Sequence, residues 1–107
     1  MGSEGVPEDY GIWEQTGIRT IVIDEIRRLA GICGMDKVIL FGSRARGDFR
    51  RESDIDLAVS GGDICRFRLA MEEDTSTLLR YDVVNLDRHI QPELRDVIMR
   101  EGVVVYE

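Results

Sequence analysis

Two hydrophobic periods alternate along the chain, and together they predict a domain of mixed helices and strands. Apolar residues recur at helical spacing over residues 16–32, which indicates an amphipathic helix that Gly31 and Gly34 help to end. A short apolar run at residues 38–41 is typical of a buried strand, and it stops at Gly42. We therefore expect the helix to pack against a sheet that contains this strand.

A second strand is indicated over residues 53–59, where polar and apolar side chains alternate. Asp54 and Asp56 fall on its polar face. Because alternate side chains of a strand project in the same direction, the two carboxylates should lie roughly 7 Å apart along it. Both acids are thus expected to face the same site.

A third acid, Asp82, stands in a strand predicted over residues 81–86, in line with apolar side chains. A carboxylate in that position needs a partner, and a cation shared with the strand of Asp54 and Asp56 would supply one. The simpler alternative is that Asp82 only caps the entry to its strand.

The remaining pattern completes a small α/β fold, of the α+β type in which the sheet is mixed. Asp63 can cap a helix over residues 64–79, and Pro92 fits the first turn of a third helix that Gly102 ends. Residues 103–106 predict a final strand at an edge. We expect a mixed sheet of about four strands with helices packed on it, in one domain over residues 15–107 after a loosely ordered segment, residues 1–14.

The junction after the first strand has the features of an anion site. Gly42 has no Cβ to keep a phosphate from the backbone, and Ser43 opens a helical turn and adds a hydroxyl donor. Ten residues separate this pair from Asp54. Neighbouring carboxylates favour a raised pKa or a bound cation, and Mg²⁺ takes one or two carboxylates together with substrate phosphate. The stretch therefore suits a triphosphate with its cations.

Four arginines crowd into the segment between the Gly-Ser turn and the acids. Arginine suits bidentate contact with phosphate, and the nearer two, Arg44 and Arg46, are candidates to reach the triphosphate. Arg50 and Arg51 are interpreted as solvated loop charges.

Charge and length exclude some functions. The net charge is −7 and the sequence pI is about 4.7, which disfavours DNA binding and hence a DNA polymerase, because affinity for nucleic acid depends on many Lys and Arg contacts. The 107 residues suffice for one core but not for a separate acceptor-binding domain, so we expect the acceptor to come from elsewhere. The sequence shows neither a membrane-spanning stretch nor a signal peptide pattern, which predicts a cytoplasmic protein without membrane contact.

These motifs resemble the nucleotidyltransferase superfamily that includes DNA polymerase beta, and within it the minimal nucleotidyltransferases paired with HEPN-domain toxins. The resemblance covers residues 37–86 and rests on Gly42, Ser43, Asp54, Asp56 and Asp82. It implies that Gly42 and Ser43 bind the β and γ phosphates of a nucleoside triphosphate, most simply ATP. It also implies that Asp54 and Asp56 hold two Mg²⁺ ions. The third acid would bind metal as well and take the proton from the attacking hydroxyl.

Three identities of the acceptor stay open at this point. The resemblance implies an antitoxin that transfers AMP to a tyrosine of a HEPN toxin. A second hypothesis is transfer to a small molecule, as in antibiotic nucleotidyltransferases, although those carry an additional helical domain. A third is a noncatalytic module that neutralises its partner by contact alone. The neighbouring gene would separate the first two, and a toxin still neutralised by an Asp54→Asn variant would favour the third.

Overall fold

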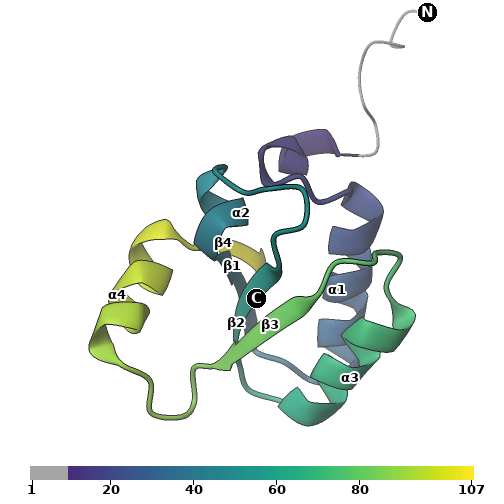
Figure 1. Ribbon diagram of the computed structural model, residues 1–107. Helices are drawn as coiled ribbons and strands as arrows, with labels where there is room; N and C mark the ends of the chain where they lie inside the picture. The colour runs from purple at the N-terminus through teal and green to yellow at the C-terminus, as the bar shows by residue number, and fades with distance from the viewer. Residues whose placement is uncertain (1–9) are drawn as a thin grey trace, which may run out of the picture.

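A four-stranded mixed sheet forms the centre of the computed structural model, which describes residues 10–107 (Figure 1). The elements along the chain are the 3₁₀ helix η2 (Gly11–Thr16), α1 (Thr20–Ile32), β1 (Lys37–Phe41), α2 (Gly42–Arg46), β2 (Ile55–Ser60), α3 (Ile64–Asp74), β3 (Tyr81–Asn85), α4 (Pro92–Glu101) and β4 (Val103–Tyr106). The strand order is β3-β2-β1-β4, with β1 antiparallel to both neighbours and β2 parallel to β3. The predicted α+β class, the mixed sheet and the edge position of β4 are confirmed.

Helices cover both faces of the sheet, so the core has two parts. Figure 1 shows α1 and α3 on one side of the strands and α4 on the other. The larger cluster packs the α1 and α3 face, and full burial of each large aliphatic side chain there contributes about 1.5–3 kcal/mol. The smaller cluster, on the α4 face, consists of Ile39, Phe41, Ala58 and Ile98. The central strands β1 and β2 are therefore buried on both faces.

The N-terminal part of the predicted helix is different in the structure. Gly17 adopts a left-handed φ of +68° and separates η2 from α1, which begins at Thr20 rather than at residue 16. Trp13 lies in η2 and is buried, so the expectation of a loosely ordered segment is wrong for residues 11–14. Residues 1–9 of that segment lie outside the described residues.

The helix after β2 is shorter than predicted. Asp63 caps α3 as expected, since its side chain accepts a hydrogen bond from the Arg66 amide. The helix ends at Asp74 instead of residue 79 because the backbone turns to an extended conformation at Thr75. Ser76, two residues past the helix end, is held by Glu25 of α1, which accepts bonds from both its amide and its hydroxyl. This tertiary contact takes the chain off the helical path.

The C-terminal elements follow the sequence prediction closely. Pro92 stands in the first turn of α4, and Gly102 is its C-cap. In the part of the chain that the structure describes, the search for a membrane-crossing helix, one both long and apolar enough, found none.

Candidate functional site

Three aspartates lie at the corner of the sheet where β2 and β3 run side by side. Parallel pairing of these strands makes Asp56 and Asp82 direct Cα partners, and Asp54 lies two residues before Asp56 at the approach to β2. Asp54 and Asp82 are exposed and Asp56 is half-buried. The structure thus brings the three predicted acids to one corner of the sheet, on the face that α4 covers.

The half-buried carboxylate lies directly against the backbone at the end of β1. Phe41 is the Cα partner of Asp56, and Gly42 follows it with a left-handed φ of +78°. A Cβ on Gly42 would stand 2.2 Å from Oδ2 of Asp56, closer than any side chain tolerates. Any larger residue would push this carboxylate aside, so glycine lets the Gly-Ser turn lie against the acidic corner.

The electrostatics of this corner favour added positive charge. Burial, together with the Asp82 and Asp54 carboxylates, raises the pKa of Asp56 to about 6, against the opposing effect of Arg46 and Arg44. Two arginines nearby therefore do not neutralise the acids. The raised pKa favours a proton or a cation at this corner.

The donor set fits a hard divalent cation such as Mg²⁺, because it consists of carboxylate oxygens with two exposed members. Among residues 10–107, no three His, Cys, Asp or Glu side chains are gathered tightly enough to count as a ready-made metal centre. The three aspartates share a corner, but their carboxylates do not converge on one point as the ligands of a single ion would. Their use as ligands would require them to turn toward a common ion.

Ser43 is placed where the sequence predicted, in the first turn of α2. Its side chain is half-buried, and no hydrogen bond among the described residues uses its hydroxyl. Its carbonyl accepts bonds from the amides of Gly47 and Asp48, which closes the short helix. The hydroxyl is thus available next to the Gly42 backbone.

Arg46 lies on the exposed side of α2 and links this helix to α4. Its side chain contacts the carboxylates of Asp48 at 3.1 Å and Glu101 at 3.3 Å, and these bonds raise the pKa of Arg46. Glu101 is a part of the site that the sequence analysis missed. No local signal could have found it, since 55 residues separate it from Arg46.

Arg44 has a different place from the one expected for a phosphate ligand. Its side chain is buried, with 2% exposed, and its guanidinium donates to backbone carbonyls of Thr16 and Ser53. Burial lowers the pKa of Arg44, although the Asp54 and Asp56 charges partly offset this. The guanidinium of Arg44 is thus occupied by backbone carbonyls of this chain, unlike the phosphate ligand that the sequence predicted. Arg50 and Arg51 are exposed, as expected.

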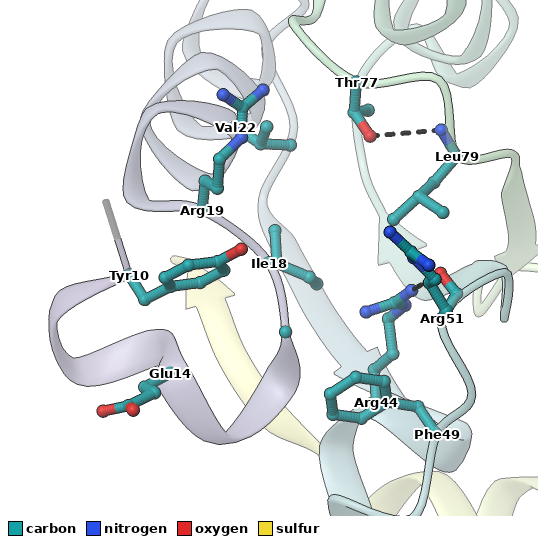
Figure 2. Close-up of a pocket in the computed structure, with 11 residues that line it drawn as sticks. Tyr10, Glu14, Ile18, Arg19, Val22, Arg44, Phe49, Arg51, Thr77 and Leu79 are labelled. Atoms are coloured by element: carbon teal, nitrogen blue, oxygen red, sulfur yellow. Dashed lines mark hydrogen bonds between the residues drawn. The ribbon is translucent and has the colours of Figure 1, made fainter. Parts of the chain in front are cut away.

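A cavity of about 620 Å³ adjoins the buried arginine (Figure 2). Figure 2 shows that the start of α1, the Phe49 loop and the segment of Thr77 and Leu79 surround it. None of the three acids, Gly42 or Ser43 lines it. The cavity is therefore separate from the acidic corner, and the sequence analysis did not anticipate it.

Comparisons with known proteins agree with this geometry. The family described as polymerase beta, nucleotidyltransferase matches residues 32–107. A protein of Methanocaldococcus jannaschii named "Putative protein adenylyltransferase" is 50% identical over 48 residues, which are 45% of this chain and 46% of that protein. The match thus spans about half the length of this curated relative.

Two solved structures have the same fold. A crystal structure of a toxin-antitoxin with AMP-PNP contains a chain that is 27% identical, with a TM-score of 0.63 over 78% of this chain and 71% of that one. A structure named "putative minimal nucleotidyltransferase" is 33% identical, with a TM-score of 0.60 over 76% of this chain and 86% of that one. Since the family match covers most of the sequence and includes the Gly-Ser turn and all three aspartates, the chain belongs to the polymerase beta nucleotidyltransferase family.

Proposed function

We propose that this nucleotidyltransferase moves AMP from ATP to a tyrosine hydroxyl of a HEPN-domain toxin, with Mg²⁺, and acts as an antitoxin. One observation carries the proposal. The carboxylate of Asp56 faces Asp82 on the neighbouring strand and lies against the backbone of Gly42, so acids and phosphate cradle adjoin. This arrangement suits a triphosphate held at one end and activated at the other.

Asp54, Asp56 and Asp82 are the residues that would hold Mg²⁺. When bound, two such ions would neutralise phosphate charge and stabilise the attacking and leaving oxygens of an in-line displacement. The raised pKa of Asp56, caused by burial and by the other two acids, supports this assignment because a cation relieves the repulsion.

The residues of the chain have distinct tasks in the proposed reaction. The Gly42 backbone and the Ser43 hydroxyl hold the β and γ phosphates, and Arg46 adds positive charge beside them. A carboxylate oxygen of Asp82 takes the proton of the acceptor hydroxyl. The acceptor oxygen bonds to the α-phosphorus while the bond from this phosphorus to the bridging oxygen breaks, and pyrophosphate leaves.

The relatives support a protein acceptor. One is named as a protein adenylyltransferase and another is part of a toxin-antitoxin crystallised with an ATP analogue. Asp82 is exposed on an edge strand, which leaves room for a docked acceptor chain. We expect the reaction in the cytoplasm, which supplies ATP.

Mass spectrometry tests the proposal. The chain is incubated with a HEPN-domain protein of the same genome, ATP and Mg²⁺, and we expect the mass of AMP to appear on a tyrosine of that protein. Asp56→Asn should reduce the transfer by at least about 100-fold, because it removes a charged ligand of the displacement. Asp96→Asn, which changes an exposed acid of α4, is the matched control and should transfer normally.

Two outcomes would redirect the proposal. Transfer to a small molecule but to no protein would contradict the protein acceptor. A toxin neutralised equally well by wild type and Asp56→Asn would favour the noncatalytic alternative, in which contact alone silences the partner.

A further inference from the structure

The buried guanidinium of Arg44 binds several backbone carbonyls of the loop that leads to Asp54 and β2. Arg44 donates through Nε to the Ser53 carbonyl at 3.0 Å and through Nη2 to the carbonyls of Arg51 at 3.2 Å and Arg50 at 3.5 Å. These acceptors belong to consecutive parts of one turn. A lysine offers one point charge and could not match this planar fork of donors.

The turn itself is closed by two further hydrogen bonds. The Ser53 amide donates to the Arg50 carbonyl at 3.0 Å, and the Arg50 amide donates to the Ser53 hydroxyl at 2.8 Å. Asp54 follows immediately. Any displacement of the turn from Arg44 therefore moves the backbone of Asp54 as well.

The other end of the guanidinium is anchored away from the turn. Its Nη1 donates to the Thr16 carbonyl at 2.9 Å, and its carbon lies 4.6 Å from the centre of the Phe49 ring. Gly17 packs so closely that a Cβ there would stand 2.4 Å from the Phe49 ring and 2.9 Å from the guanidinium. Arg44 is thus held on one side by the junction of η2 with α1, and on the other side by the 50–53 turn (Figure 2).

We propose that Arg44 is a positioning residue, which holds the 50–53 turn by its carbonyls and so fixes Asp54 for the reaction. The claim that Arg44 holds the turn rests on the geometry alone. The claim that this serves the reaction rests on the proposed function. It also gives the segment of residues 10–19 a part in the site, although that segment lies outside the family match. The guanidinium of Arg44 binds backbone carbonyls of this chain rather than a substrate.

The test compares Arg44→Lys with Arg28→Lys, an exposed arginine of α1. We expect Arg44→Lys to speed hydrogen exchange of the Arg50 and Ser53 amides by about tenfold or more, while exchange of the β1 amides stays as in the wild type. For AMP transfer, kcat should fall by about 10- to 100-fold, since small misplacements cost about that much, while KM for ATP changes less than about threefold. Arg28→Lys should change none of these values.

Chemical rescue adds a readout that a general loss of stability would not give. The cavity of Figure 2 opens onto Arg44, so guanidinium ion at millimolar concentration should restore part of kcat to Arg44→Ala. It should restore none to Asp56→Asn.

Several results would overturn the inference. One is faster exchange spread evenly over the loop and β1, which indicates a purely structural role. Another is a loosened turn with an unchanged kcat. If the wild type transfers AMP to no acceptor, the proposed function fails instead. Two measurements on the wild type and Arg44→Lys then still decide whether Arg44 fixes the turn and Asp54. One is the hydrogen exchange described above, and the other is the Mg²⁺ concentration that half-saturates the stabilisation by AMP-PNP.

Discussion

Asp56 is the acid of the site whose ionised form is disfavoured by burial and by two neighbouring carboxylates. Its carboxylate is half-buried, faces Asp82 and contacts the Gly42 backbone. Burial and the two neighbouring acids raise its pKa to about 6 in the folded chain, against 3.8 for an ordinary aspartate. The negative charge that the proposed reaction requires at Asp56 therefore lowers the stability of the fold.

This cost predicts a pH dependence of unfolding without divalent ions. Between pH 4 and 6 the folded chain binds more protons at Asp56 than the unfolded chain, so its free energy of unfolding falls as pH rises through that window. After discounting for the partial exposure of the side chain, the loss is about 1 to 2 kcal/mol. Asp56→Asn should recover it, and denaturant unfolding in EDTA at pH 4 and pH 8 would measure the difference.

The same charge change at an innocuous position is the control. Asp96→Asn should keep the wild-type pH dependence, because Asp96 is exposed on α4. Stability of Asp56→Asn that falls between pH 4 and 8 as much as in the wild type would contradict the assigned electrostatics.

Two arginines show what residue type alone could predict here. The sequence placed Arg44 and Arg46 together near the nucleotide, yet they do different work. Positions two apart on a helix point about 200° away from each other, so one faces the core and the other the solvent. Which one is buried depends on how α2 packs against η2 and the loop, and that packing is tertiary.

At the scale of elements, the junction of β1 and α2 determines the site. It places the Gly42 backbone against the Asp56 carboxylate because the strand ends opposite Asp56, and Ser43 follows directly in the chain. Periodicity predicted this junction correctly, as it predicted every strand. The break at Gly17 was missed because the apolar spacing over residues 16–32 continues across it, and η2 was missed because residues 1–14 were expected to be loosely ordered.

Gly42→Ala tests the junction. The new methyl would displace the Asp56 carboxylate, which can swing aside, so we expect a loss of about 1–3 kcal/mol in stability, mostly from the φ of +78°. AMP transfer should fall by at least about tenfold because the acid is misplaced. Unfolding and transfer assays on one preparation would measure both.

Gly34→Ala is the matched control for backbone strain. Gly34 has a similar φ of +71°, but a Cβ there would meet no atom within 4 Å. It should lose comparable stability and keep its transfer rate. Equal loss of transfer in the two variants would show that strain, not the contact with Asp56, explains the effect.

At the scale of the whole molecule, the parallel pairing of β2 and β3 brings distant acids together. The aspartates of the two strands were assigned to one site because an acid in an apolar strand needs a partner, and the resemblance agreed. The contact of Arg46 with Glu101 and the cavity beside Arg44 were not predictable. They depend on how α4 and η2 dock, which hydrophobic periodicity does not determine.

The most direct test of the central claim is thermal stabilisation by Mg²⁺ with AMP-PNP. For the wild type, ligand at about 100 times its Kd should add about 2.7 kcal/mol and raise Tm by about 10 °C, and Mg²⁺ should be required. Asp82→Asn should lose most of this Mg²⁺-dependent shift, while Asp96→Asn keeps it. A shift as large in Asp82→Asn as in the wild type would contradict a cation site shared between β2 and β3.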